Sequence, residues 1–292
     1  MLEAVPNVSE GRDATAIAAI EDAFSSRAAV LDVHSDADHH RSVFTLAGSD
    51  RDLTASLVAG AAAACERIDL RSHDGVHPRV GAVDVVPLVP LEAGSMPEAK
   101  RVALVVAEQL ASELALPVFL YGEAGTERRP AFYRRGGIDE LARRIGVGEL
   151  VPDRGPAVLD PRVGVVLVGA RAPLVAYNLD LATDDVRVAR GVAAAVRESG
   201  GGMPGVQAIG LFLPRAGRVQ VSMNVLDLER SPLHEVVERV TREAATLRVG
   251  VVGGELVGLV PELVVRAAAA AGASIPGIDE SHVLERRLAT RL

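Results

Sequence analysis

The sequence predicts an α/β (α+β) fold of two similar βαββαβ-type subdomains, with mixed sheets covered by helices and a ligand groove between them. Three observations support this fold class. Short apolar segments alternate with amphipathic helical ones, the alternation resumes at Val165 after an irregular stretch, and 292 residues is long for a single core. We expect one subdomain over residues 1–178 and a second over residues 179–292.

Composition favours a globular protein of the cytoplasm. Hydrophobic residues make up 49% of the chain and charged residues 24%, and no apolar run reaches the roughly 18 to 20 residues of a membrane span. Residues 1–4 carry no basic segment ahead of an apolar core, so we expect no secretory signal. The single cysteine, Cys65, excludes an internal disulfide and a cysteine-based metal site. A net charge of −8 argues against a nucleic-acid surface.

The first six predicted elements have the order of a split βαβ sandwich. They are a strand over residues 2–8, a helix capped by Asp13, strands over 30–34 and 41–47, a helix over 50–66 and a strand over 83–89. A capping box at Ser95 and Glu98 then begins a helix that runs to about Ala115, and a strand over 117–121 follows. Residues 123–155 are rich in Arg, Gly and Pro, and we expect a surface excursion with one short helix near 138–145.

A second set of elements begins at Val165. It comprises strands over 165–168 and 174–179, a helix capped by Thr183, a hairpin over 206–213 and 219–225, a helix from Ser231-Pro232 and a strand over 247–252. The tail over 261–292 is predicted to be helical at first. Two similar lobes favour a ligand site in the groove between them.

The strongest candidate for chemistry is His77, within the run Asp74-Gly75-Val76-His77-Pro78-Arg79. Histidine takes and gives a proton near neutral pH, and the neighbouring proline and glycine restrict the backbone. A rigid surface turn that happens to contain a histidine has the same pattern, so the residues alone leave both interpretations open.

Five of the seven histidines fall between the second predicted strand and this run; they are His34, His39, His40, His73 and His77. Their density raises the possibility of a metal site. The spacing does not support one, because no His-x3-His occurs and His39 and His40 in an extended segment would point to opposite faces. We expect no metal here, and either a solvated polar loop or side chains that line an organic substrate pocket.

Two glycine-containing turns are further candidates for binding. Asn7 and Glu10 lie at the end of the first strand, at the edge where α/β clefts usually open. The stretch from Gly155 to Gly164 would let the backbone approach a flat ligand, although an ordinary hairpin needs the same residues. Neither stretch is a phosphate-binding fingerprint, so nucleotide-dependent chemistry is not expected.

Together these segments resemble the formiminotransferase family, whose members move a formimidoyl group from N-formimidoyl-glutamate to tetrahydrofolate. The resemblance covers essentially the whole chain and rests on matching runs in the same order. They are residues 5–11, 68–70, 73–85, 121–124, 155–156, 169–171, 176–178, 206–210, 220–224 and 256–261. The family fold, two α/β subdomains with a folate groove between them, agrees with the repeat described above.

The resemblance implies that His77 is the catalytic acid/base. It also implies that Gly155, Pro156 and Gly164 lie along the folate, with tetrahydrofolate as a co-substrate and without a metal or a nucleotide. Pairing of family members through the N-terminal lobe leads us to expect a homodimer.

Four residues are expected to bind the donor substrate. Arg41 and Arg79 suit bidentate recognition of its carboxylates, and Glu10, or alternatively Asp36 or Asp38, suits a cationic amidine-like centre. Asn7 belongs to the same turn as Glu10.

The sequence also departs from the family's pattern near the presumed centre. His34 stands where Asp is common, His40 where Asn is common, Val76 where Glu is common and Val80 where Met is common, and Val163 replaces an aromatic residue. The donor therefore stays open between formimidoyl-glutamate, formimidoyl-glycine and a formyl transfer between 5-formyltetrahydrofolate and glutamate. A non-catalytic folate-binding protein is the remaining alternative, and the role of His34, His39 and His40 is not assigned.

Overall fold

The computed structural model describes residues 1–125 and 128–291, and the chain divides into two compact units, Met1–Ala172 and Pro173–Leu292. This division precedes the predicted boundary at residue 178. The reason is that the strand β8 (Val175–Leu181) already belongs to the second sheet. No helix among the described residues is both long and apolar enough to cross a membrane.

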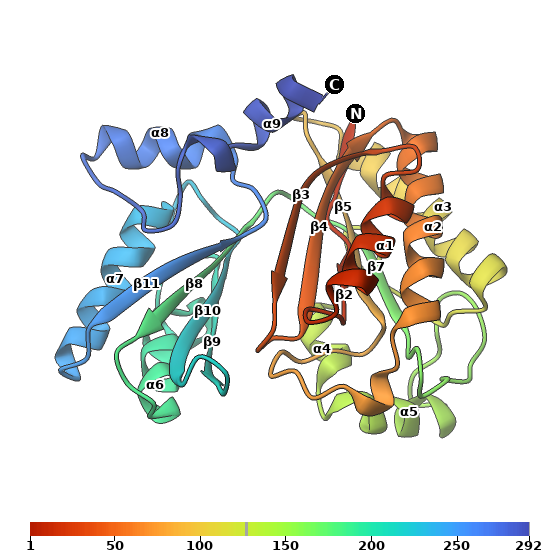
Figure 1. The fold of residues 1–292 in the computed structure, drawn as a ribbon, viewed down its shortest axis with the longest axis horizontal. Helices are drawn as coiled ribbons and strands as arrows, with labels where there is room; N and C mark the ends of the chain where they lie inside the picture. The colour runs from red at the N-terminus through yellow and green to blue at the C-terminus, as the bar shows by residue number, and fades with distance from the viewer. Residues whose placement is uncertain (126–127, 292) are drawn as a thin grey trace. The chain divides into compact units, whose positions relative to one another are not determined.

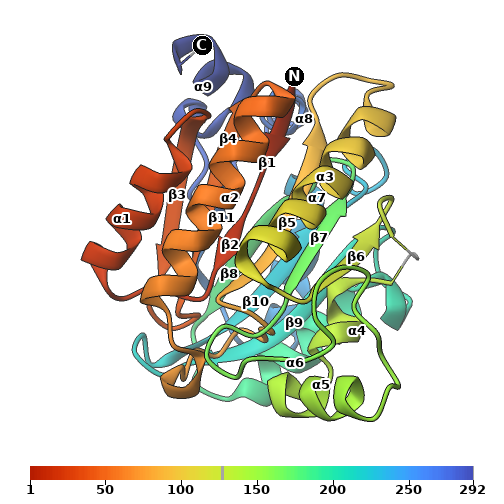
Figure 2. The same cartoon turned by 90° about the vertical axis from the view of Figure 1, so that its right-hand side faces the viewer.

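The first unit contains a seven-stranded sheet with α1 (Ala14–Phe24), α2 (Asp50–Arg67) and α3 (Met96–Leu114) on one face (Figures 1 and 2). Its strands are β1 (Leu2–Ala4), β2 (Asn7–Val8), β3 (Ala29–Asp36), β4 (Arg41–Gly48), β5 (Val83–Pro90), β6 (Val118–Gly122) and β7 (Val166–Ala170). The order across the sheet is β3, β4, the β1/β2 pair, β5, β7, β6. Alternate residues of each strand, such as Phe44 and Leu46 of β4, face the helices.

The predicted first strand is interrupted. Residues 2–8 form β1 and β2, each paired antiparallel to both β4 and β5, with Val5 and Pro6 between them. Pro6 lacks an N–H for the ladder, although its carbonyl oxygen still accepts from Phe44 N at 3.0 Å. The interruption directly precedes Asn7 and the turn that follows it, both of which belong to the candidate site.

The strand that the sequence assigned to the start of the second set, residues 165–168, belongs to the first sheet. It is β7, which pairs parallel with both β5 and β6 and so lies between them. The sequence predicts both parallel and antiparallel strand pairs in each of the two sheets, but among the described residues parallel pairs occur in the first sheet alone. In the second sheet every pairing among the described residues is antiparallel.

The predicted surface excursion over residues 123–155 is in part buried. It contains α4 (Pro130–Arg134) and α5 (Gly137–Gly146), and these pack on the sheet face opposite α1–α3. Tyr133 is 2% exposed; its ring lies 4.9 Å from that of Phe119, and its hydroxyl donates to Leu120 O at 3.2 Å. Threonine and glutamate at positions 126 and 127 lie outside the described residues.

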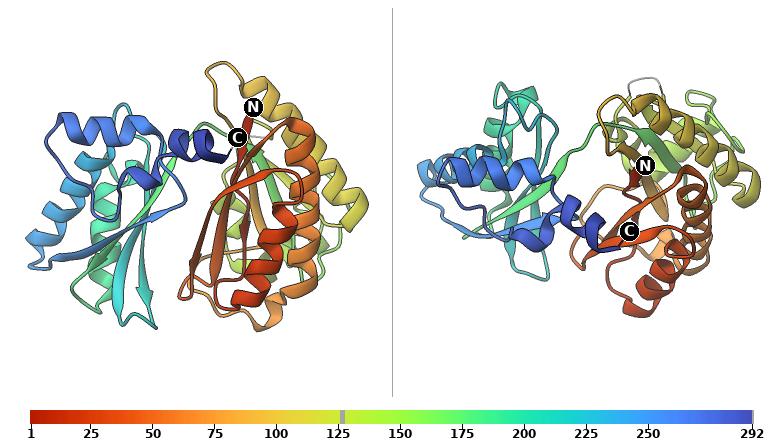
Figure 3. Two further views of the ribbon diagram at one scale, coloured as in Figure 1. Left: turned by 45° about the horizontal axis from the view of Figure 1, so that its top comes forward. Right: turned by 90° about the horizontal axis from the view of Figure 1, so that it is seen from above.

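The second unit has the βαββαβ order that the sequence predicted: β8, α6 (Val186–Val196), β9 (Val206–Leu213), β10 (Arg218–Val225), α7 (Leu233–Thr246) and β11 (Val251–Val257). The order across its sheet is β11, β8, β10, β9, with α6 and α7 on one face (Figure 3). The helices α8 (Glu262–Ala270) and α9 (Leu284–Arg291) follow.

Three local predictions in these elements are wrong. The last strand begins at Val251 and not at residue 247, because residues 247–250 form the turn after α7. The N-cap of α6 is Asp185, whose carboxylate accepts from Arg187 N; Thr183 instead accepts from Asp185 N. Ser95 precedes α3 without a side-chain cap, because its backbone is not extended there.

Candidate active site

His77 lies in the irregular segment between the 3-10 helix η1 (Leu70–Ser72) and β5, and Arg79 holds this segment together. The guanidinium of Arg79 donates from Nη1 to Gly75 O at 2.9 Å and to His77 O at 3.3 Å, and from Nη2 to His73 O. The sequence predicted that Arg79 would bind a substrate carboxylate. In the structure Nη1 and Nη2 donate to backbone carbonyls of its own loop, which fixes the path of the chain around His77, and substrate binding by Arg79 stays a prediction.

A second turn, residues 37–40 between β3 and β4, is joined to this loop by backbone and side-chain hydrogen bonds. Val76 N donates to Asp38 O at 3.0 Å, and Arg12 pairs with Asp74 while its Nε donates to Ala37 O at 2.8 Å. The contact is too close for a side chain at Gly75, where a Cβ would lie 2.3 Å from His39 O. Glycine at position 75 is therefore required by the packing of the two turns.

The rings of His40 and His73 stack across this junction, with centroids 4.2 Å apart. His73 Nε2 lies 2.8 Å from His40 O, and Gly75 N donates to His73 Nδ1 at 3.2 Å, an arrangement that suits a neutral ring protonated at Nε2. Burial and the positive charge of Arg79 lower the pKa of His73 to about 4. His39 and His40 lie in a tight turn between the two strands, with φ of 51° at His40.

Asp84, the second residue of β5, is the centre of a buried ionic network. Its Oδ2 accepts from Arg41 Nη1 at 2.7 Å and from Arg134 Nη2, and its Oδ1 accepts from Val80 N at 2.8 Å. Burial alone would raise the pKa of Asp84, but the charges of Arg134 and Arg41 outweigh it and hold that pKa well below the usual value.

Arg41 also donates from Nε and Nη2 to Asn7 Oδ1, at 3.0 and 2.7 Å, and Asn7 Nδ2 donates to Val5 O. The structure therefore brings two of the predicted substrate-binding residues, Asn7 and Arg41, together. Both are engaged with each other and with Asp84, and this is not the free bidentate edge that the sequence led us to expect of Arg41.

Glu10 closes the turn between β2 and α1, where its Oε1 accepts from Arg12 N at 2.7 Å and from Asp13 N at 3.0 Å. The same atom lies 3.4 Å from His40 Nδ1. Glu10 is thus placed next to the stacked histidine pair.

The His77 residue is partly exposed, but one of its two ring nitrogens is buried. Its Nδ1 is buried without a hydrogen-bond partner among the described residues, and its ring centroid lies 5.8 Å from that of His39. Burial, followed by the positive charges of Arg41 and Arg134, holds the pKa of His77 well below its usual value near 6.5. The imidazole is therefore neutral at physiological pH and able to accept a proton.

The predicted folate-binding stretch meets this site at one end. Gly164 has φ of 72°, and a Cβ there would lie 2.1 Å from Val80 O; Gly164 forms a bridge with Gly81. Gly155, with φ of 80°, packs instead against Leu116 O and Ala111. The fold itself requires glycine at positions 155 and 164. Gly155 and the neighbouring Pro156 are nevertheless exposed, so they remain accessible to a ligand.

Arg134 and Asp84 are the site residues that the sequence interpretation missed. Asp84 lies in the strand predicted over residues 83–89, and Arg134 lies in the surface excursion predicted over residues 123–155. Pro130 at the start of α4 was an available signal of a helix, because proline favours the first turn.

Within residues 1–125 and 128–291, no group of three or more His, Cys, Asp or Glu side chains is arranged to hold a metal ion.

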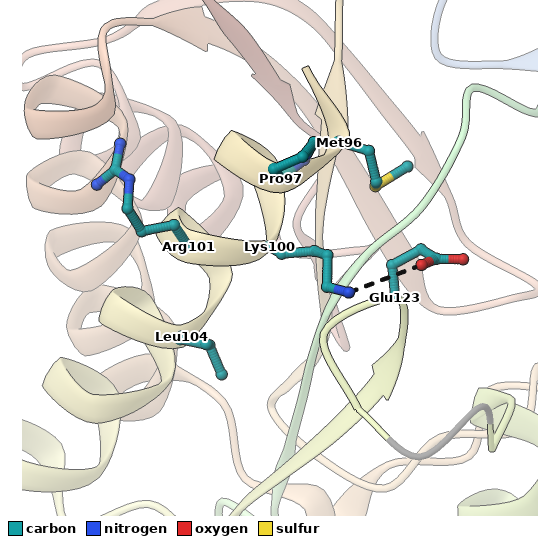
Figure 4. A pocket seen from close by; sticks show the side chains of 6 residues that line it. All are labelled: Met96, Pro97, Lys100, Arg101, Leu104 and Glu123. Atoms are coloured by element: carbon teal, nitrogen blue, oxygen red, sulfur yellow. Dashed lines mark ion pairs between the residues drawn. The ribbon is translucent and has the colours of Figure 1, made fainter. Parts of the chain in front are cut away.

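A hollow in the first unit lies apart from this site. Its volume is about 500 Å³, and it lies where α3 begins and β6 ends, lined by Met96, Pro97, Lys100, Arg101, Leu104 and Glu123 (Figure 4). Lys100 Nζ and Glu123 Oε2 are 3.9 Å apart there.

Comparison with known proteins identifies relatives over most of the chain. The family description "Formiminotransferase domain, N-terminal subdomain" matches residues 1–171, and "Formiminotransferase domain" matches residues 176–272. A glutamate formimidoyltransferase of Thermoplasma acidophilum is 37% identical over 99% of this chain and 97% of its own length. One from Streptococcus pyogenes is 38% identical, with 89% of each chain covered. A formimidoyltransferase-cyclodeaminase of Sus scrofa is 40% identical over 89% of this chain, which spans 50% of that relative. The chain therefore belongs to the formiminotransferase family.

Proposed function

We propose that the protein transfers a formimidoyl group from N-formimidoyl-L-glutamate to tetrahydrofolate, in histidine degradation. The observation that carries this proposal is His77, a neutral histidine whose buried Nδ1 has no hydrogen-bond partner in the part of the chain that the structure describes. The chain also matches a glutamate formimidoyltransferase over nearly its full length. The neutral ring of His77 can act as a base before it acts as an acid.

In the proposed reaction, N5 of tetrahydrofolate attacks the formimidoyl carbon. A new C–N5 bond forms, and the proton lost from N5 passes to His77. His77 then returns a proton to the departing glutamate nitrogen as the old C–N bond breaks, so the products are 5-formimidoyltetrahydrofolate and glutamate. A positioned acid/base of this kind contributes typically ~10²–10⁴-fold to the rate.

The carboxylates of the neighbouring turn are proposed to stabilise the cationic donor. Asp36 accepts from His39 N at 2.5 Å, Asp38 is 7% exposed, and the His39 ring lies beside that of His77. We assign Arg41 and Asn7 to the support of this site, through Asp84. The exposed Gly155 and Pro156, with Gly164, remain the proposed folate-binding stretch.

We propose further that the protein acts as a homodimer in the cytoplasm and uses tetrahydrofolate as a co-substrate, without a metal or a nucleotide. Light scattering of the purified protein tests the dimer. Activity that survives dialysis against a chelator supports the proposed absence of a metal.

The decisive experiment incubates the purified protein with tetrahydrofolate and one donor at a time and measures the 5-substituted folate that forms. We expect product with formimidoyl-glutamate. Product only with formimidoyl-glycine, or formyl transfer between 5-formyltetrahydrofolate and glutamate, would change the donor. Tight folate binding with no turnover of any donor would identify a non-catalytic folate-binding protein and contradict the proposal.

A further inference from the structure

The helix α4 brings a charged side chain from the excursion after β6 to the site of His77. Arg134 is the last residue of α4, and its Nη2 donates to Asp84 Oδ2, the oxygen that also accepts from Arg41 Nη1. Only 15% of the Arg134 side chain is exposed, and its Nε is buried without a hydrogen-bond partner among the described residues.

The carboxylate of Asp84 links Arg134 to the loop that carries His77, the irregular segment between η1 and β5. Its other oxygen accepts from Val80 N, three residues after His77, so one buried group fixes both the end of the loop and the position of Arg134. The aromatic ring of Tyr133, next to Arg134 in α4, packs on Phe119 and anchors the helix against the sheet. The position of this guanidinium is therefore determined by the fold.

The charge around His77 does not balance. The charged and titratable groups that act most strongly on its imidazole are Arg41 from β4, Asp84 from β5, Arg134 from α4 and His39 from the turn before β4. Within this group two guanidinium groups share one carboxylate, which leaves one net positive charge. A second positive charge on His77 would be repelled by this excess.

We propose that Arg134 is a positioning residue for the reaction at His77, which, through Asp84, holds the loop in place and keeps the imidazole in its proton-accepting form. The inference rests on the proposed function for the role of His77 in transfer. The charge effect on the ring is a separate property, and it can be measured without any substrate.

The test compares Arg134→Met and Arg134→Gln with Arg134→Lys. The first two remove the charge, and the glutamine variant keeps an amide donor for Asp84, so that a folded neutral variant is available if methionine leaves the site unfolded. Arg143→Met on α5 is the matched control, because the ion pairs of Arg143 within the described part of the chain are with the exposed carboxylates of Glu140 and Glu149. Thermal unfolding establishes that each variant is folded.

The first readout is an NMR titration of the ¹⁵N-labelled His77 imidazole, with its signal assigned through His77→Gln. We expect the midpoint to rise by about 1 pH unit in the two neutral variants and to stay at the wild-type value in Arg134→Lys and Arg143→Met. A wild-type midpoint in a folded neutral variant, or an equal rise in Arg134→Lys, would overturn the inference.

The second readout is the pH profile of kcat/KM with formimidoyl-glutamate and tetrahydrofolate. Its acidic limb is expected to move to higher pH in the neutral variants, in step with the NMR midpoint. If the midpoint moves but no variant, nor the wild type, turns over the donor, the proposed function fails and the charge effect on His77 stands. If turnover is normal and the midpoint does not move, the function stands and the role of Arg134 is refuted.

Discussion

The guanidinium of Arg41 donates to Asp84 Oδ2 at 2.7 Å, inside the first unit and with the carboxylate fully buried. Arg134 shares that oxygen, so one carboxylate compensates two arginines. A buried charge that loses its partner is costly, because neither water nor another group replaces the lost interaction.

Replacement of Asp84 is therefore expected to destabilise the protein strongly. Asp84→Ala should lower the free energy of unfolding by about 3–5 kcal/mol, measured by chemical denaturation. Glu238→Ala is the control, since Glu238 pairs with Arg242 at the surface of α7 and should change stability very little. Equal losses in the two variants would show that Asp84 is not the partner of buried charges.

His77→Gln is expected to reduce kcat for formimidoyl transfer by ~10²–10⁴-fold, because the amide cannot shuttle a proton. We would measure kcat from the amount of 5-formimidoyltetrahydrofolate formed in assays stopped at fixed times. His282→Gln serves as control: His282 lies in the second unit, where it closes a capping box with Asp279, and its loss should leave kcat unchanged. A His77→Gln enzyme with near-normal turnover would refute the central assignment.

A side chain at Gly75 should separate the two turns of the site. Gly75→Ala places a Cβ 2.3 Å from His39 O, so the loop must shift, and we expect kcat to fall at least about tenfold along with a lower Tm. Gly146→Ala, at the end of α5, meets no atom within 4 Å and should be neutral or slightly stabilising. Full activity in Gly75→Ala would mean that the loop tolerates this shift.

Arg79→Ala is expected to lower kcat more than it changes KM for the amino-acid donor, because Arg79 holds the carbonyls of the His77 loop. Steady-state kinetics would separate the two parameters, with Arg71→Ala as a surface control. A large rise in KM at unchanged kcat would instead restore the carboxylate-binding role that the sequence suggested.

The His73 ring predicts a specific pH dependence of stability. The unfolded chain binds a proton at this residue near pH 6.5 and the folded protein only near pH 4, so between these values the unfolded state is favoured by proton uptake. The contribution of neutral His73 is fully present above about pH 6.5 and is lost as the pH falls toward 4. Solvent screening of this half-buried ring limits it to about 1 kcal/mol.

His73→Gln removes that titration, and the comparison isolates it from the lowered pKa values of His40 and His77. Denaturation at several pH values should show the wild type losing more stability than the variant between pH 6.5 and 4. Parallel losses in the two proteins would contradict a His73 that stays neutral in the folded protein.

Local patterns in the sequence were sufficient for most elements. The alternation over residues 41–47 gave β4, and Asp13 caps α1 through bonds to Thr15 N and Ala16 N as expected. The position of β7 was not predictable in this way, because an apolar run is the same whether its strand continues one sheet or begins another. His77 was identified from residue type and family resemblance.

The network of hydrogen bonds and ion pairs around His77 could not be predicted, because it depends on contacts between residues that are distant in the sequence. Arg41 and Arg79 have the chemistry to bind a carboxylate, but in the structure Arg41 donates to Asn7 and Asp84, and Arg79 to the backbone of its own loop. Arg134 is fifty residues from Asp84 in the chain, and no spacing rule connects them.

The place of β7 has a consequence for synthesis on the ribosome. Among the described strands β6 pairs only with β7, and β7 is the last strand of the first sheet to leave the ribosome. Until residue 170 emerges, β5 and β6 each present an open edge with unpaired backbone groups. Nascent chains that stall before that point are expected to be substrates for chaperones, and rare codons between residues 122 and 166 would prolong the exposure.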